Sequence, residues 1–149
     1  MGPALQALLT LVTAVVLALS AFAAFAQQSK SVDGVVLQLG IMSAERAVHA
    51  EGHREAHPAT FPGGSQHVLI TLADAKSHKP IADADVVVEV VDPKGVVQKK
   101  ALLHTSAAGM PDYSELFVFG WSGTYALRVT ANRAKEKPLK TTFTVHHSL

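Results

Sequence analysis

Three histidines at intervals of four residues are the side chains in this sequence best suited to chemistry. They are His49, His53 and His57, in a chain of 149 residues that holds eight histidines and no cysteine. If the segment is helical, neighbouring members lie on one face with Cβ atoms about 5–6 Å apart, and two imidazoles at that separation can bind one metal ion. The spacing therefore predicts a transition-metal site. A solvated helix face rich in Ala, Glu, His and Arg is the alternative interpretation.

A fourth candidate ligand is His67, which begins the apolar stretch after the histidine-rich segment. Loops and termini collect at the ends of a β-sandwich, so we expect His67 to lie near His57 and to complete the ligand set. Glu51 and Glu55 are suited to add an oxygen ligand or to orient an imidazole. The predicted metal ligands are His49, His53, His57 and His67.

The remaining histidines carry weaker signals. His78 lies in a polar turn, where a solvent-exposed side chain is the simpler interpretation. His104 and Met110 flank a predicted loop and offer an imidazole and a thioether, a pair that copper(I) accepts. His146 and His147 are adjacent on a predicted strand, so they point to opposite faces and only one of them can serve a given site.

Apolar residues at every second position predict the strands that would hold these histidines. The turn sequence Asp92-Pro93-Lys94-Gly95 predicts a hairpin, and Ser43 is a suitable N-cap for a short helix. We predict an all-β protein, an Ig-like antiparallel β-sandwich of about seven strands that spans 35–149, with a short helical histidine-rich insertion at 43–64. The predicted strands cover 35–41, 67–72, 86–91, 97–103, 113–119, 124–131 and 139–146.

The first 26 residues hold no charged residue and no histidine. An apolar centre from Leu8 to Leu19 precedes Ala24-Phe25-Ala26, which fits the cleavage site of a secretory signal peptide. We therefore predict a signal peptide at 1–26, a flexible lead-in at 27–34, and a protein that is periplasmic or secreted. Because the apolar stretch has about the length that spans a bilayer, an uncleaved membrane anchor is the alternative.

Composition argues against several classes of function. The net charge is +1 with both signs interspersed, so no basic face is available for nucleic acid. Gly120-Trp121-Ser122-Gly123 precedes a predicted strand, whereas a nucleophile elbow follows one. No Glu follows His49 directly, so the zinc-protease motif is absent. We predict that the protein is not an enzyme.

Three segments together resemble a known family. They are Gln66 to Asp74, then Lys79-Pro-Ile-Ala-Asp-Ala-Asp-Val86 with the turn Asp92-Pro93-x-Gly95, and Gly123-Thr-Tyr125-x-Leu-x-Val129. The sequence from about Gln66 to His147 is similar to the bacterial periplasmic Ig-like domains grouped as YtkA-like and FixH-like. That resemblance implies an Ig-like fold and a role in copper handling or respiratory-oxidase assembly.

The sequence favours a periplasmic accessory or carrier protein that binds copper, or zinc as the second choice. The alternative is a non-enzymatic Ig-like interaction module that binds no metal and docks on an envelope or membrane protein partner. Convergence of the four histidines on one point would separate the two, because imidazole nitrogens bind such metals at about 2.0–2.1 Å.

Overall fold

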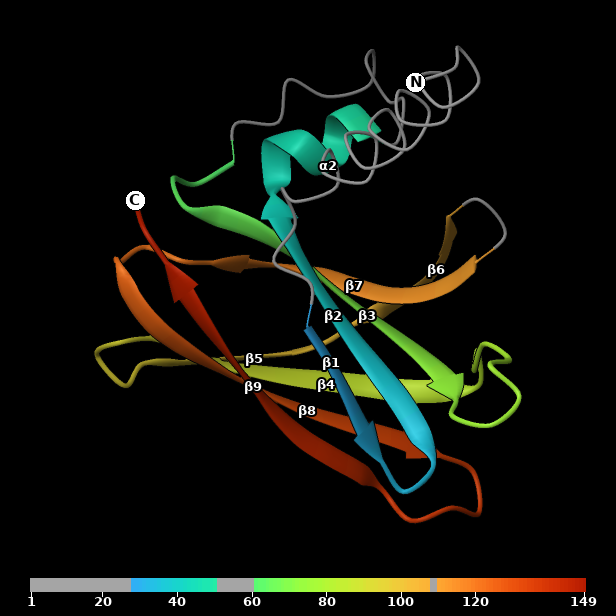
Figure 1. Ribbon diagram of the computed structural model, residues 1–149. Helices are drawn as coiled ribbons and strands as arrows, with labels where there is room; N and C mark the ends of the chain where they lie inside the picture. Colours follow the sequence, from blue (N-terminus) through green and yellow to red (C-terminus); the bar gives the residue numbers. More distant parts are fainter. Residues whose placement is uncertain (1–27, 51–60, 108–109) are drawn as a thin grey trace, which may run out of the picture.

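Two antiparallel sheets form a sandwich in the computed structural model, which describes residues 28–50, 61–107 and 110–149 (Figure 1). One sheet has five strands in the order β1-β2-β3-β7-β6, and the other has four in the order β5-β4-β8-β9. The prediction of an all-β sandwich with one short helix is confirmed. The elements are β1 (Gln28–Val32), β2 (Val35–Ser43), α2 (Ala44–Ala50), β3 (Ser65–Asp74), β4 (Ala84–Val91), β5 (Val97–Ala101), β6 (Leu103–Ala107), β7 (Met110–Val118), β8 (Gly123–Arg133) and β9 (Leu139–His147).

The order of the strands is that of an immunoglobulin domain. The run β2-β3-β7-β6 corresponds to strands A, B, E and D, and the run β4-β8-β9 corresponds to C, F and G. Consecutive strands β5 and β6 lie in different sheets, and Leu102 between them is buried where the chain crosses. The crossing makes the connection that a Greek-key sandwich requires.

Alternating apolar residues form the core between the sheets, as predicted. The inward sets on β3, β4 and β8 are almost fully buried, and the ring of Tyr125 on β8 stacks on that of Phe119, with centroids 4.3 Å apart. These sets are Val68, Ile70 and Leu72, then Val86, Val88 and Val90, then Tyr125, Leu127 and Val129. The sequence pattern therefore predicted which face of each of these strands is buried.

A tyrosine corner fixes the turn between β7 and β8. The hydroxyl of Tyr125 donates a hydrogen bond to the carbonyl oxygen of Trp121 at 2.9 Å and accepts one from its amide at 3.0 Å. This arrangement near the start of strand F is a hallmark of Ig-like domains. It holds the main chain of Trp121 in place.

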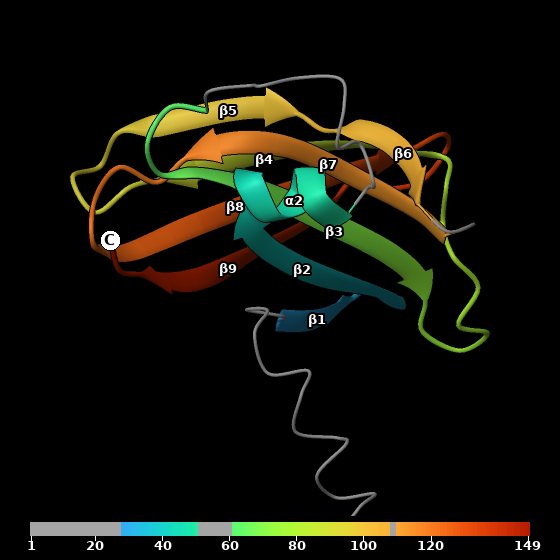
Figure 2. The same cartoon turned by 90° about the horizontal axis from the view of Figure 1, so that it is seen from above.

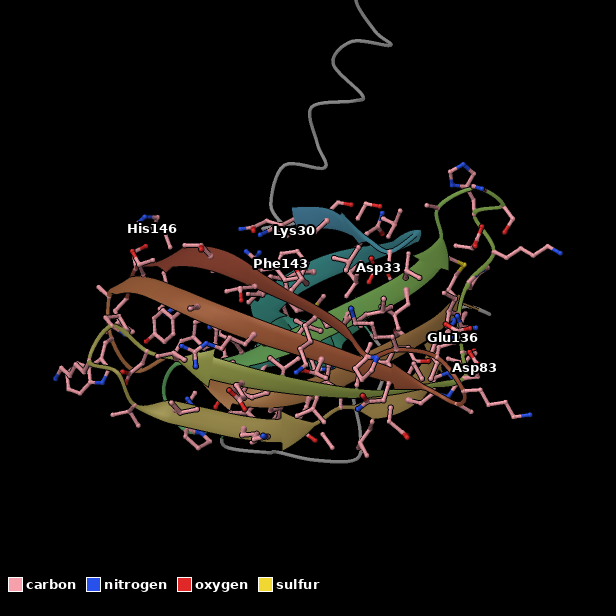
Figure 3. All side chains as sticks on the ribbon, turned by 90° about the horizontal axis from the view of Figure 1, so that it is seen from below. Lys30, Asp33, Asp83, Glu136, Phe143 and His146 are labelled. Carbon is pink, nitrogen blue, oxygen red and sulfur yellow. The ribbon has the colours of Figure 1, made fainter. Side chains whose placement is uncertain are left out.

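Side chains connect the two sheets along both of their open sides. On one side, Gln98 of β5 exchanges two hydrogen bonds with the main chain of Val118 on β7, at 2.7 and 3.0 Å. On the other side, Lys30 of β1 donates to the carbonyl oxygen of Thr142 on β9, and its Nζ lies 5.6 Å from the ring centroid of Phe143 (Figure 3). Strand edges that would be open are thereby partly occupied.

Two strands lie where the sequence indicated irregular chain. Residues 27–34 were expected to be a flexible lead-in, but Gln28–Val32 pair with β2 as strand β1. Strand β6 pairs with the first half of β7, in the region predicted as a loop between His104 and Met110. Both strands lie at a sheet edge and carry many exposed polar side chains, so neither shows the alternation that marks a half-buried strand. The predicted signal peptide at 1–26 lies outside the described residues.

The sandwich has two ends, and α2 lies at one of them. At this end, which we call the α2 end, strands β2, β4, β7 and β9 finish and β3, β5 and β8 begin. Helix α2 follows β2 directly and lies over the outer face of the five-stranded sheet, in contact with β2 and β3 (Figures 1 and 2). Among the described residues, no helix is long and apolar enough to cross a membrane.

Candidate metal centre

A methionine and a histidine lie side by side at the α2 end of the five-stranded sheet. In the register of β2 and β3, Met42 is directly opposite His67. Both alternate with core residues, so both belong to the outer face of the sheet and both are half-buried. Residues opposite each other on antiparallel strands have Cβ atoms about 4.5–5.5 Å apart, so a thioether and an imidazole are neighbours on this face.

The imidazole of His67 has an unusual environment. Its Nδ1 atom is buried and has no hydrogen-bond partner among the described residues. Most buried polar side-chain atoms have a partner, and leaving one unpaired costs about 1–3 kcal/mol. A neutral imidazole nitrogen is a common metal ligand, so a bound ion would compensate for the missing hydrogen bond. The chemistry of this donor pair therefore fits a soft transition metal.

Helix α2 brings the first predicted ligand to the same end. The amide of Arg46 lies 3.4 Å from Oγ of Ser43, which agrees with the predicted N-cap. Ala44 and Ala47 are buried, and their small side chains let the helix pack closely on the sheet. His49 lies in the last turn of this helix, which contacts the strand that carries His67.

The other two predicted ligands, His53 and His57, lie outside the described residues. The chain that holds them joins α2 to β3, and both of these elements meet at the α2 end. The convergence of His49, His53, His57 and His67 therefore stays a prediction. No group of three or more His, Asp or Glu side chains that could hold a metal ion occurs within 28–50, 61–107 and 110–149. A complete site needs donors beyond Met42 and His67.

The two histidines near the C-terminus also lie at the α2 end, but on opposite faces of β9, as predicted. His146 is exposed, and its Nδ1 lies 3.3 Å from Oγ1 of Thr124 (Figure 3). His147 points toward the core, edge-on to Phe119 and Tyr125 at centroid distances of 5.5 and 6.1 Å. Its Nε2 is buried and lacks a hydrogen-bond partner within the described part of the chain.

The weaker candidates lie toward the opposite end of the sandwich. His78 belongs to the β3–β4 connection, where its φ of 57° marks a turn. The ring centroids of His104 and Tyr113 lie 5.1 Å apart, and the two residues are opposite each other in the β6–β7 ladder. Met110 is exposed at the first position of β7. The turn position of His78 agrees with its simpler interpretation, whereas His104 and Met110 lie in strands and not in the predicted loop.

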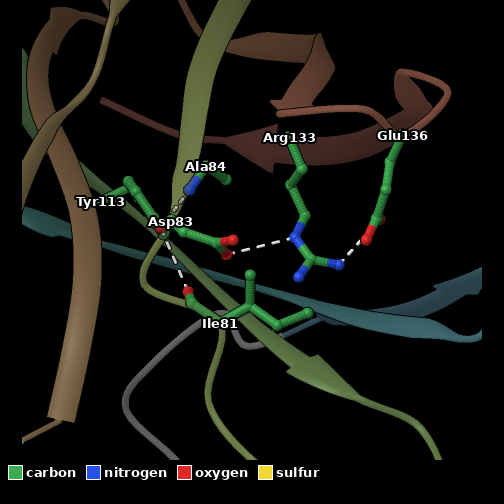
Figure 4. Close-up of polar contacts among 6 residues, drawn as sticks. All are labelled: Ile81, Asp83, Ala84, Tyr113, Arg133 and Glu136. Atoms are coloured by element: carbon green, nitrogen blue, oxygen red, sulfur yellow. Dashed lines mark hydrogen bonds and ion pairs between the residues drawn. The ribbon is translucent and has the colours of Figure 1, made fainter.

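Charged residues at this opposite end form a structural network (Figure 4). Arg133 lies between the carboxylates of Asp83 and Glu136, at 3.2 and 2.8 Å, and these carboxylates raise the pKa of its guanidinium. The Tyr113 hydroxyl donates to the carbonyl oxygen of Ile81 and accepts from the amide of Ala84, both at 3.1 Å. Burial raises the pKa of this hydroxyl. The network fixes the start of β4.

Met42 is the candidate ligand that sequence reasoning missed. It follows the alternation that ends at Ile41, so the sequence already indicates that it faces away from the core. Its partner across the ladder depends on how β2 and β3 align, and their register is visible only in the structure.

Comparison with known proteins identifies structures of similar fold. No protein-family model matches the chain, and a search of curated proteins found no match. A DUF4426 family protein from Pseudomonas aeruginosa aligns with a TM-score of 0.63 and 13% identity, over 81% of this chain and 94% of that chain. FetP from uropathogenic Escherichia coli strain F11, expressed in the periplasm of E. coli, aligns with a TM-score of 0.63 and 10% identity, over 83% and 94%.

Copper-reconstituted P19 from Campylobacter jejuni is a third structure of similar fold. It aligns with a TM-score of 0.62 and 11% identity, over 83% of this chain and 95% of that chain. Variants of both FetP and P19 are described as copper-bound. At identities of 10–13%, these alignments establish likeness of fold.

Proposed function

We propose that this protein binds copper, and zinc as the second choice, and acts as a periplasmic accessory or carrier protein without enzymatic activity. The proposed ligands are His49, His53, His57 and His67, joined by the thioether of Met42. The observation that carries the proposal is the pairing of Met42 with an imidazole whose Nδ1 is buried and lacks a partner among the described residues. A metal ion bound to this nitrogen and to the neighbouring sulfur of Met42 would replace the missing hydrogen bond.

Likeness of fold supports the same function. Copper is present in structures of P19 and of a FetP variant, whose sandwiches resemble this one. The sequence resemblance to YtkA-like and FixH-like domains also implies copper handling, although no family model matches. These two lines of support are independent of the Met42–His67 geometry.

The donor set favours copper(I) over zinc(II). Thioether sulfur is a soft ligand that prefers copper(I), whereas imidazole accepts copper and zinc alike. Each imidazole must be neutral to bind, so metal affinity should fall as the pH drops below about 6.5, the ordinary histidine value. Methionine does not titrate, so this pH dependence comes from the histidines.

The proposed localisation rests on the N-terminal sequence. Small residues at Ala24 and Ala26 predict cleavage before Gln27. N-terminal sequencing of exported protein should therefore begin at Gln27. A mature chain that retains Leu8 to Leu19 would instead establish the membrane-anchored form.

The alternative, an interaction module of the cell envelope, has one observation in its favour. Trp121 and Val96 are exposed at the α2 end, where they offer apolar surface to a partner. This surface is separate from the outer face that carries Met42 and His67. An apolar surface at this place is therefore compatible with two kinds of protein. One binds metal and also docks on a partner, and the other only docks on a partner.

Calorimetric titration of the mature protein with copper(I), copper(II) and zinc(II) tests the proposed function. We expect binding of at least copper(I), weakened at least tenfold in His67→Ala, which corresponds to about 1.4 kcal/mol. The double variant with His53→Ala and His57→Ala should lose still more, because two imidazoles are removed from the four-residue series. His104→Ala and His78→Ala are matched controls that should bind as the wild type does.

Two results would contradict the proposal. Wild-type affinity for all three ions in the double variant would exclude the histidine-rich segment. Absence of binding in the wild-type protein at neutral pH would leave the interaction module as the function.

A further inference from the structure

Several exposed apolar side chains gather at one corner of the α2 end. Val96 in the β4–β5 turn, Trp121 in the β7–β8 turn and the terminal Leu149 are 60%, 47% and 76% exposed. These three residues together with Lys94 form a surface that we call the tryptophan tip. Figure 1 shows both turns and the C-terminus on the same side of the sandwich.

Direct contacts hold the parts of this tip together. Nζ of Lys94 lies 3.0 Å from the ring centroid of Trp121, a cation–π contact between the two turns. Gly123 has a φ of 141°, and a Cβ there would lie 2.8 Å from Cγ of Pro93, so the turns pack too closely for any larger residue. The amide of Leu149 donates to Oγ of Ser122 at 3.0 Å.

Hydrogen bonds fix the main chain of the tip, although its side chains contribute little to the core. The tyrosine corner holds the main chain of Trp121, whose carbonyl oxygen accepts a hydrogen bond from the Tyr125 hydroxyl and whose amide donates one to it. Oδ1 of Asp92 accepts hydrogen bonds from the amides of Lys94 and Val96, both at 2.8 Å. A large aromatic side chain is therefore presented to solvent on a fixed support, which suits contact with a surface.

We propose that the tryptophan tip binds the surface of a lipid bilayer. Tryptophan is enriched at membrane–water interfaces, where its ring lies at the level of the headgroups. The ammonium group of Lys94, which lies over the Trp121 ring, would be at the same level, where it can pair with lipid phosphate. Val96 and Leu149 add apolar side chains on the same corner, so the tip combines the side chains that interfacial contact requires.

The N-terminal sequence supports a lipid surface over other occupants. Residues 1–26 hold no charged residue and include an apolar stretch of bilayer length. Strand β1 is antiparallel to β2, with Val32 opposite Val35 and Gln28 opposite Leu39. The start of β1 is therefore its end nearer the α2 end. The chain therefore enters the domain at the end that carries the tip, so an N-terminal segment held in the bilayer, during export or as a retained anchor, would keep the tip at the lipid surface.

This contact would bring the proposed metal site close to the membrane. His67 and the helix that carries His49 lie at the same end of the sandwich as the tip. A protein docked in this way would present its metal to a membrane-embedded acceptor. The lipid contact itself does not depend on metal binding, so the two proposals can be tested separately.

Fluorescence of Trp121 tests the lipid contact directly, because it is the only tryptophan in the chain. The exported protein, freed of metal by a chelator, is mixed with vesicles of phosphatidylcholine and phosphatidylglycerol. We expect a blue shift of the emission and quenching by lipids that carry a nitroxide near the headgroup. Protein that begins at Gln27 is used, because a retained anchor would by itself bring Trp121 to the lipid.

Matched variants at the two ends of the sandwich provide the control. Val96→Glu should reduce the quenching at least fivefold, whereas Leu103→Glu and Met110→Glu, at positions 66% and 59% exposed away from the tip, should leave it unchanged. Circular dichroism melts establish that each variant is folded. The proposal would be overturned if Leu103→Glu and Met110→Glu reduced the quenching as much as Val96→Glu does. It would also be overturned if the wild type showed no quenching. A blue shift that grows with protein concentration without vesicles would do the same and identify a second copy as the occupant.

Discussion

Met42 and His67 occupy opposite positions in the β2–β3 ladder, although helix α2 and the histidine-rich segment lie between them in sequence. The pairing places a thioether beside an imidazole with a buried, unpartnered Nδ1 within the described structure. Helix α2 packs on the same two strands, and its buried Ala44 and Ala47 let it approach the sheet closely.

Replacing Met42 by Leu should change metal preference. Leucine keeps the volume of the side chain but removes the sulfur, so copper(I) affinity should fall about tenfold or more. Zinc affinity should change less than threefold, because thioether is a poor ligand for zinc. Competition titrations with a chromophoric chelator measure both affinities. Met110→Leu is the matched control, and an equal loss for both metals would show that Met42 acts only through packing.

Replacing His67 by Phe should separate metal binding from stability. Without metal, the variant should be as stable as the wild type or more stable, because the unpartnered nitrogen is removed and the ring volume is roughly kept. With excess copper(I), only the wild type should gain stability, since a ligand that binds the folded state shifts the unfolding equilibrium.

Urea unfolding with metal and with chelator gives the comparison. In the control variant His104→Phe, the gain in stability with metal should persist. A large loss of stability in metal-free His67→Phe would mean that His67 has a structural role.

Truncation of Val88 to Ala should destabilise the fold by about 1–3 kcal/mol, because the side chain is fully buried at the centre of the core. Val87 alternates with it and is only half-buried on the outer face, so Val87→Ala should cost less. Lys99→Ala should be nearly neutral, since its ion pair with Glu89 at 2.9 Å lies at the surface. Denaturant melts measure the free energy of unfolding of all three variants. An equal loss of stability in Val87→Ala and Val88→Ala would contradict the assigned faces of β4.

Acid should weaken the β3–β4 turn through Asp74. Hydrogen bonds from the amide and hydroxyl of Ser77 and from the amide of Lys76 lower the pKa of this carboxyl. A carboxyl with a lowered pKa stabilises the folded state above its unfolded value of about 3.9. That contribution disappears as the pH falls through the lower, folded value.

The urea midpoint of Asp74→Asn should therefore fall less steeply below pH 4 than that of the wild type. Ser77→Ala should give an intermediate slope, because two of the hydrogen bonds remain. If the urea midpoints of all three proteins fell in parallel with pH, the Asp74 carboxyl would be ruled out as a source of acid sensitivity.

Much of the fold could be predicted because its strands are half-buried. Residues such as Val86, Val88 and Val90 alternate with less buried ones, and this period of two is a local property of the sequence. The strands β1 and β6 escaped detection because edge position leaves their side chains exposed. For β1, stability comes from pairing with β2 and from side chains such as Lys30 that bind β9 across the open side.

The candidate site was only partly predictable for a different reason. The four-residue spacing of His49, His53 and His57 is a local signal, and the gathering of strand ends at one end of a sandwich predicts that His67 lies near them. The proposed role of Met42 depends on its position opposite His67, and this long-range register is not contained in one sequence. Convergence of the histidine-rich segment on this pair stays a prediction.

X-ray absorption spectroscopy of the copper(I)-loaded protein tests the central claim most directly, because it identifies the atoms bound to the metal. The account predicts imidazole nitrogens together with one sulfur scatterer, and loss of that sulfur in Met42→Leu but not in Met110→Leu. A spectrum with nitrogen and oxygen scatterers alone, or one that keeps its sulfur in Met42→Leu, would contradict the account.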